Sequence, residues 1–239
     1  MRREFDRQQS LLETAGLARA QVVQNWLLLL ATRLTEADGS LWDPCLIECE
    51  ELESDCRGFE QTCMQVISRL RPTGTELKKV LLMSQFWAML RQCAGLGERI
   101  AAVTVEFSYI ADFHVPGALR ELALSTGEAL ITSIRALREW DTDVCVESME
   151  ISTQTRRQAA TLQQVALERL RGGQTDVQCL LRLQLIIEWL SQIAENAAAF
   201  SKDIRRAVAE CPASQIALVP DALDDLRPDE WVVRAALRV

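Results

Sequence analysis

The sequence predicts an all-α protein made of two tandem three-helix bundles, with six long helices and a C-terminal tail. The first observation behind this prediction is a seam of apolar residues whose steps alternate between three and four, which places them on one face of a helix. The second is that the same seam returns 97 positions later in the same register. The two seams consist of Phe86, Met89, Cys93, Leu96, Ile100, Val103 and Phe107, and of Leu183, Ile186, Leu190, Ile193, Ala197, Phe200 and Ile204. The repetition indicates an internal duplication in which each copy is built around its last helix.

The composition is that of a helical protein. The chain has 239 residues, of which 49% are hydrophobic, and only ten are glycine and six are proline. This length can bury a core as one large domain or as two of about a hundred residues each. The sharpest break inside the chain is the turn at 113–117, which contains His114 and Pro116. We therefore expect a first repeat at 1–113, a second at 114–210 and a tail at 211–239.

Three helices are expected in the first repeat. The first helix spans 5–36, before the break at 38–40, and its apolar face is expected to hold Leu12, Ala15, Val22, Trp26 and Leu29. The second spans 41–70 and stops at the break 71–75, which contains a proline and a glycine. The third spans 76–107 and carries the first seam.

The second repeat follows the same plan. Its first helix is expected at 118–140, with Leu119, Leu122, Leu130, Ile134 and Leu137 facing inward. Asp141 begins the next helix, whose seam of small and partly polar residues is Met149, Ser152, Thr155, Ala159 and Leu162. The break at 171–175 ends that helix, and the sixth helix runs to about Glu210. In the tail, Pro228 and the acids that follow it favour a short terminal helix.

The balance of charges and the shortness of the apolar runs limit the location and the partners. The formal net charge of −8 argues against nucleic acid and against an anionic membrane surface as a partner. The longest apolar run, 26–31, is far shorter than the ~20 residues of a transmembrane helix. The first residues are charged and amphipathic and do not resemble a signal peptide. We expect a cytoplasmic protein with no membrane insertion.

Eight cysteines invite the question of disulfides or a zinc site. Three of them alternate with apolar residues along the second helix, in the order Cys49, Leu52, Cys56, Phe59, Cys63 and Val66. A thiol in such a place behaves as a small apolar side chain. The sequence has no CxxC pair, and its one histidine is far from these residues. The spacing therefore favours core cysteines over zinc or redox chemistry.

The sequence carries no catalytic signature. It contains no GxxxxGK[ST], HExxH or GxSxG motif, and no convincing strand that a glycine-rich loop could follow. A pair formed by a nucleophile and a histidine would depend on His114, two residues before Pro116. We therefore expect a protein that is not an enzyme.

Two sets of acidic residues are candidate sites. On the last helix, Glu188 and Glu195 share a face with Gln184 and Gln192, and Glu98 is the counterpart of Glu195 in the first repeat. Carboxylates on adjacent turns can hold a hard metal cation, although a solvent-exposed face accounts for the same pattern. The second set lies along the second helix and forms either a partner-binding surface or a solvated face. It consists of Glu48, Glu50, Glu51, Glu53 and Asp55.

Together these features resemble the PhoU family of phosphate-uptake regulators. The resemblance extends over nearly the whole chain up to about Glu210, and includes the stretch RLRPTGTELKKVLLMSQFWAMLRQCAGLGERI that closes the first repeat. It also includes Asp38 and Asp141, which begin the second helix of each repeat, and the break at 71–73. PhoU-like proteins are cytoplasmic and commonly dimeric. The resemblance implies contacts with a phosphate-importing ABC transporter and with a sensor histidine kinase.

Many PhoU-like proteins also carry metal ions on a Glu-x-x-x-Asp motif in the third helix of each repeat, together with acids from the second helix. This sequence departs from that pattern. The motif falls on Arg91 and Gly95 in the first repeat and on Glu188 and Gln192 in the second, and the second-helix acids fall on Cys49, Glu53, Ser152 and Arg156. An arginine ~5 Å from a divalent cation costs about 6 kcal/mol at an effective dielectric of about 20. We expect no bound metal and no other cofactor.

The leading hypothesis is a non-enzymatic regulatory adaptor of phosphate uptake or phosphate signalling, a homodimer that acts through protein contacts. One alternative is a metal-binding helical bundle that holds a divalent or ferric ion. Another is a PhoU-like scaffold that serves a different protein partner through its acidic second helix or its tail.

Overall fold

The computed structural model describes residues 2–33, 42–107, 117–172 and 177–210, and within them every regular element is an α-helix. The predicted all-α class is therefore confirmed. The six helices are α1 (Arg2–Arg33), α2 (Asp43–Leu70), α3 (Thr75–Phe107), α4 (Gly117–Glu139), α5 (Thr142–Arg171) and α6 (Val177–Glu210). The break at 38–40, the boundary at 113/114 with His114, and the tail 211–239 lie outside the described residues. Among the described helices, none combines the length and the apolar character needed to span a bilayer.

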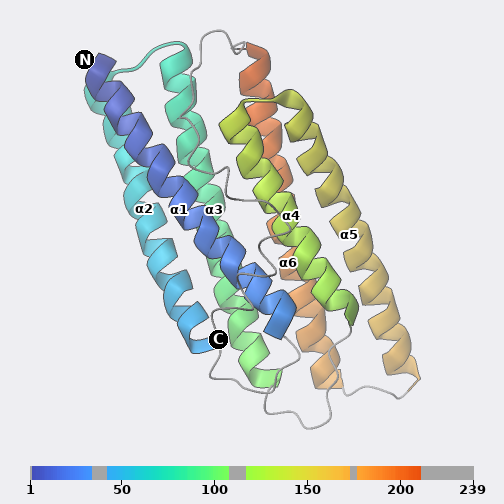
Figure 1. Ribbon diagram of the computed structural model, residues 1–239. Helices are drawn as coiled ribbons and strands as arrows, with labels where there is room; N and C mark the ends of the chain where they lie inside the picture. Colours follow the sequence, from blue (N-terminus) through green and yellow to red (C-terminus); the bar gives the residue numbers. More distant parts are fainter. Residues whose placement is uncertain (1, 34–41, 108–116, 173–176, 211–239) are drawn as a thin grey trace.

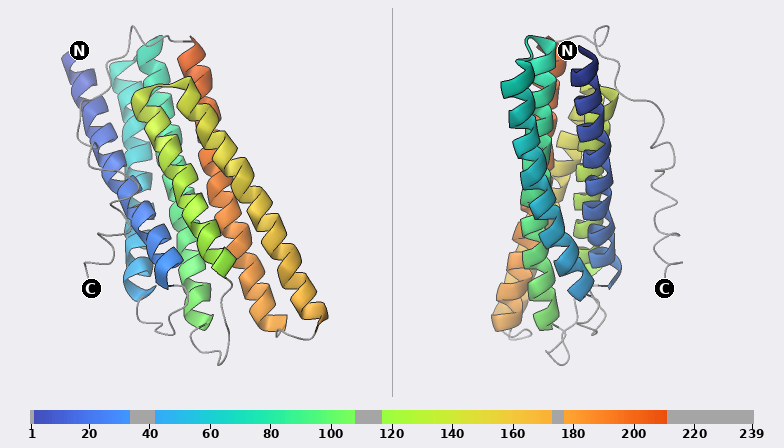
Figure 2. Two further views of the ribbon diagram at one scale, coloured as in Figure 1. Left: turned by 45° about the vertical axis from the view of Figure 1, so that its right-hand side comes forward. Right: turned by 90° about the vertical axis from the view of Figure 1, so that its left-hand side faces the viewer.

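The helices alternate in direction and form two groups of three (Figure 1). In the first group α1, α2 and α3 contact one another, and in the second α4, α5 and α6 do. The groups are joined where α3 packs against α6 and α1 packs against α4. Viewed along the layers, α1 and α4 lie on one side, while α2, α3 and α6 lie on the other (Figure 2). The long helices α3 and α6 therefore form the centre of the molecule.

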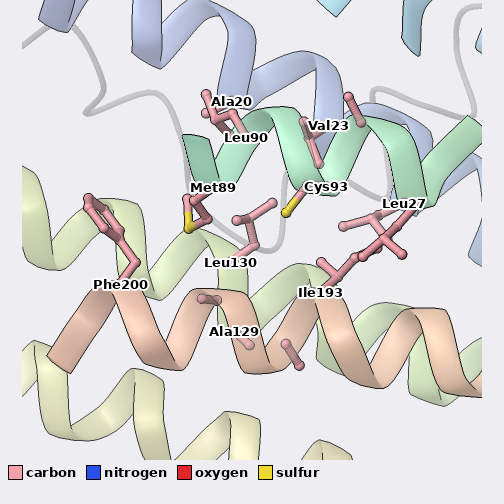
Figure 3. Packing of buried hydrophobic residues seen from close by; sticks show 14 of the residues in the cluster. Ala20, Val23, Leu27, Met89, Leu90, Cys93, Ala129, Leu130, Ile193 and Phe200 are labelled. Atoms are coloured by element: carbon pink, nitrogen blue, oxygen red, sulfur yellow. The ribbon is translucent and has the colours of Figure 1, made fainter. Parts of the chain in front are cut away.

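The two predicted seams lie in the core. All seven residues of the α6 seam are buried, and so are the five seam residues of α3 from Phe86 to Ile100, while Val103 is partly buried. Phe86 and Phe200 meet in the middle, with ring centroids 5.6 Å apart. Figure 3 shows side chains of α1, α3, α4 and α6 converging in one space, among them Leu27, Cys93, Leu130 and Ile193. The two groups therefore share one continuous core.

The predicted apolar face of α1 is rotated by about one residue. Leu12 and Trp26 are buried as expected, but Ala15, Val22 and Leu29 are only partly buried. Among the side chains of α1 that the structure describes, the buried apolar ones are Phe5, Leu12, Ala20, Val23, Trp26, Leu27 and Leu30, and the polar Gln9 and Gln24 are buried as well. The physical reason is that α1 contacts α2, α3 and α4, so it buries a wide arc whose centre a single stripe does not define.

Local backbone chemistry fixes two of the predicted helix ends. Arg71, at the end of α2, adopts a left-handed conformation with φ 47°, and its N–H donates to the carbonyl of Ile67. Pro72 follows and cannot continue the helix. At the start of α5, the Asp141 carboxylate accepts a hydrogen bond of 2.7 Å from the N–H of Asp143, which caps the helix as predicted.

The cysteines that the structure describes are free thiols in the core, as their spacing predicted. Burial is the main cause that raises the pKa of Cys49, Cys56, Cys63 and Cys93 to about 12. A protonated thiol is a weak nucleophile and a poor metal ligand. These residues therefore behave as packing side chains at neutral pH.

Candidate functional site

The first-repeat candidate face, on α3, contains an inter-helix ion pair. Arg91 Nε lies 2.8 Å from Glu60 Oε1 of α2, and both side chains are about one-third exposed or less. The hydrogen bond from Arg91 to Glu60 is the largest cause that raises the pKa of Arg91, and the negative charge of Glu53 contributes in the same direction. The α2 edge thus presents its acids to a guanidinium of α3.

The other positions of this face supply few oxygen ligands. Gly95 has no neighbour near the position where a Cβ would stand, so the helix surface is open there. Cys49 is buried, and the nearby charge of Glu98 helps to raise its pKa. Trp87, one turn before Arg91, is fully buried and stacks on Phe59 of α2 at a centroid distance of 4.3 Å. This face of α3 therefore packs against α2 at Trp87 and forms an ion pair with α2 at Arg91.

In the second repeat the arrangement differs in detail and ends in a similar ion pair. Arg156 Nε of α5 lies 3.0 Å from Glu195 Oε1 of α6. Ser152, one turn earlier on α5, is buried and donates a 2.7 Å hydrogen bond to the carbonyl of Ala194. Glu188 and Gln192 point to solvent. The structure therefore brings Glu195 to an arginine, and it leaves Glu188 exposed.

A metal ion of the kind that the resemblance implies does not fit these residues. Within the described residues there is no group of three or more His, Cys, Asp or Glu side chains placed to hold one. In the first repeat the carboxylate of Glu60 is paired with Arg91, and in the second the carboxylate of Glu195 is paired with Arg156. Ser152 is held against the backbone of α6, where a longer acidic side chain would have to push the helices apart.

The acidic run of α2 is divided by its contacts. Glu48, Glu50 and Glu51 are exposed. Asp55 forms an ion pair with Arg19 of α1, and Glu53 lies 2.5 Å from Arg57 on its own helix. Within this run, the exposed carboxylates that form no ion pair with another described residue are thus those of the first turns of α2.

Three ion pairs between helices could not be predicted from the sequence. Glu60 was absent from the candidate acids, although it lies seven residues after Glu53 and so returns to the same side of α2. Two ion pairs between α3 and α6 were also missed: Lys78 Nζ to Glu210 Oε2 and Arg182 Nε to Glu106 Oε2, both 2.6 Å. Their charges give no signal in one sequence, because the partner of each lies far away along the chain.

The comparisons with known proteins identify the fold. No family model matches the chain, and no curated protein matches it. Its structure is similar to PhoU from Pseudomonas aeruginosa, with a TM-score of 0.80 and 13% identity over 86% of this chain and 99% of that one. It is also similar to the phosphate transport system regulatory protein PhoU from Streptococcus pneumoniae, with a TM-score of 0.76 and 15% identity over 90% of this chain and 100% of that one. The chain therefore has the fold of PhoU proteins.

Proposed function

We propose that this chain is a regulator of phosphate uptake or phosphate signalling that acts through contacts with other proteins and performs no catalysis. The observation that carries the proposal is the similarity to two PhoU structures over most of the chain, one of them described as a phosphate transport system regulatory protein. The buried, protonated thiols of the helical core are not placed for cysteine-based catalysis.

The partners that we propose are the ATPase of a phosphate-importing ABC transporter and a sensor histidine kinase, with the protein working in the cytoplasm as a homodimer. The surface that we propose for one of these contacts is the start of α2, where Glu48, Glu50 and Glu51 are exposed. Exposed carboxylates on α2 would attract a basic patch on the partner and orient it during association. Their removal should therefore lower the association rate and the affinity.

The test is a pull-down with the full chain as bait and the transporter ATPase and sensor kinase of the same cell as prey. Binding of at least one of them, together with loss of phosphate-dependent gene repression on deletion of the gene, would support the proposal. Two negative pull-downs with unchanged expression would overturn it.

A pair of matched variants locates the contact. Glu48→Gln, Glu50→Gln and Glu51→Gln in one protein should weaken capture, most clearly at low salt. Glu121→Gln with Glu128→Gln, on exposed positions of α4, is the control for loss of negative charge elsewhere. Equal effects of the two variants would exclude α2 as a specific contact surface while leaving the regulatory role open.

A further inference from the structure

We propose that the ion pairs Arg91–Glu60 and Arg156–Glu195 take the place of bound metal ions, so that guanidinium groups supply the positive charge between the helices and the protein needs no cation there. The proposal concerns the chemistry of the bundle itself and does not depend on the proposed function.

Both pairs join the two helices that pack most closely in each repeat, and the second pair is the more exposed to solvent. Arg91–Glu60 joins α3 to α2, and Arg156–Glu195 joins α5 to α6. These are the second and third helices of each repeat, and they lie side by side along their length (Figure 1). A cation at the contact of two helices offsets the negative charge of the carboxylates near it.

The arginine in the first repeat is bonded to one acid and lies in the field of a second, Glu53, which is itself paired with Arg57. Glu60 accepts its hydrogen bond, and Glu53, two turns earlier on α2, adds to the negative field that raises the pKa of Arg91. A free metal ion would have to displace a cation that is tethered to the backbone and already bonded. The guanidinium therefore competes for these carboxylates at a high effective concentration.

The two repeats place their arginines on opposite helices. In the first repeat the arginine is on α3, the last helix, and its acid is on α2. In the second repeat the arginine is on α5, the middle helix, and its acid is on α6. The counterpart of Arg91, 97 positions later, is Glu188. Glu98, the counterpart of Glu195, lies seven residues from Arg91. The pairs are thus not copies of one ancestral pair, and the two repeats place their fixed positive charges about two helical turns apart along equivalent helix contacts.

The second repeat suggests the decisive variant for the first. Arg91→Glu and Glu60→Arg each leave two like charges facing each other, and each should lower the Tm of the full chain by roughly 1–3 °C. The combined variant moves the arginine to the middle helix, as in the second repeat, and should restore most of that loss. Arg206→Glu, at an exposed position of α6 where arginine pairs with Asp203 of the same helix, is the control for charge reversal.

Thermal denaturation of each protein in EDTA and in manganese completes the experiment. The unaltered protein should have the same Tm in both, because its carboxylates already hold arginines. A Tm that rises with manganese in the unaltered protein, or manganese retained through purification, would overturn the proposal. A combined variant that is no more stable than the two single variants would also overturn the proposal. The attraction between the arginine and the carboxylate would then not stabilise this contact.

Discussion

Burial holds the thiols of the core in their protonated form. Cys56 of α2 and Cys93 of α3 both have a pKa raised to about 12, mainly by desolvation. A neutral thiol suits an apolar site, whereas a thiolate there would lose its hydration. These residues therefore tie the stability of the fold to pH at the alkaline end.

The sign of that dependence follows from where the thiols ionise. Below the ordinary thiol pKa of 9.0, the thiols are protonated in both the folded and the unfolded chain. Between pH 9 and about 12, the unfolded chain loses these protons while the folded chain keeps them, so the free energy of unfolding should fall as pH rises. Urea titrations at several pH values should show a shallower fall in Cys56→Ala, and an unchanged slope in that variant would contradict the buried thiol as a source.

Core and surface positions should separate clearly in stability. Ile193 is fully buried between the repeats, so Ile193→Ala should cost about 2–5 kcal/mol. Glu50 is exposed on α2, and Glu50→Ala should change the free energy of unfolding by no more than about 0.5 kcal/mol. Urea denaturation compares them directly, and equal costs would mean that the assigned helix faces are wrong.

At the scale of the element, α3 contains two glycines with opposite surroundings. A Cβ at Gly97 would lie 2.5 Å from Cζ2 and 2.7 Å from Cε2 of Trp26, on α1. A Cβ at Gly95 would meet nothing within 4 Å. The absence of a side chain at Gly97 thus lets the rigid indole of α1 lie against α3, while Gly95 carries only the conformational cost of a glycine inside a helix.

Alanine at these two positions should therefore have effects of opposite sign. Gly97→Ala forces Trp26 or the whole helix to move and should destabilise the protein by about 1–3 kcal/mol. Gly95→Ala should stabilise it by about 0.5–1 kcal/mol through helix propensity. Differential scanning calorimetry of both variants is sufficient, and a loss of stability at Gly95 would show that this face is covered in solution.

The helices also differ in how well the sequence predicts which residues they bury. The α6 seam was predictable because a helix with one buried stripe repeats its apolar residues at fixed steps. On α1 the run from Trp26 to Leu30 is apolar all round, so the pattern did not fix which residues face the core. The pairing of Arg91 with Glu60 depends on how far α2 is shifted along α3, and no pattern within either helix records that shift. The fold was therefore predictable in class, and the ion pairs of the site were not.

On the scale of the whole molecule, the two groups of helices are held together by their shared apolar core and by ion pairs near its two ends. Ion pairs stand at both ends of the antiparallel α3–α6 contact, Lys78–Glu210 at one end and Arg182–Glu106 at the other. All four side chains are partly or largely exposed, so salt and water weaken their attraction. The apolar contact of Phe86 with Phe200 lies between them, closed to water.

The apolar contact between α3 and α6 should therefore contribute more to the free energy of unfolding than the exposed ion pairs do. Phe200→Ala should cost about 3–5 kcal/mol and should destabilise both groups in a single unfolding transition. Lys78→Ala together with Arg182→Ala should have a much smaller effect that shrinks further in high salt. Circular dichroism and tryptophan fluorescence, recorded in the same urea series, would reveal two transitions if the groups unfold separately.

The shared core has a consequence for how the protein holds together at low concentration. A first group on its own would leave Phe86, Met89 and Cys93 without the cover of α6 and would have to bury them against a second molecule. Because both halves are joined in one chain, each meets the other at an effective concentration that does not depend on the amount of protein in solution. The molecule is in this sense a covalently tethered dimer of its own halves, and its folding, unlike that of an obligate dimer, does not weaken on dilution.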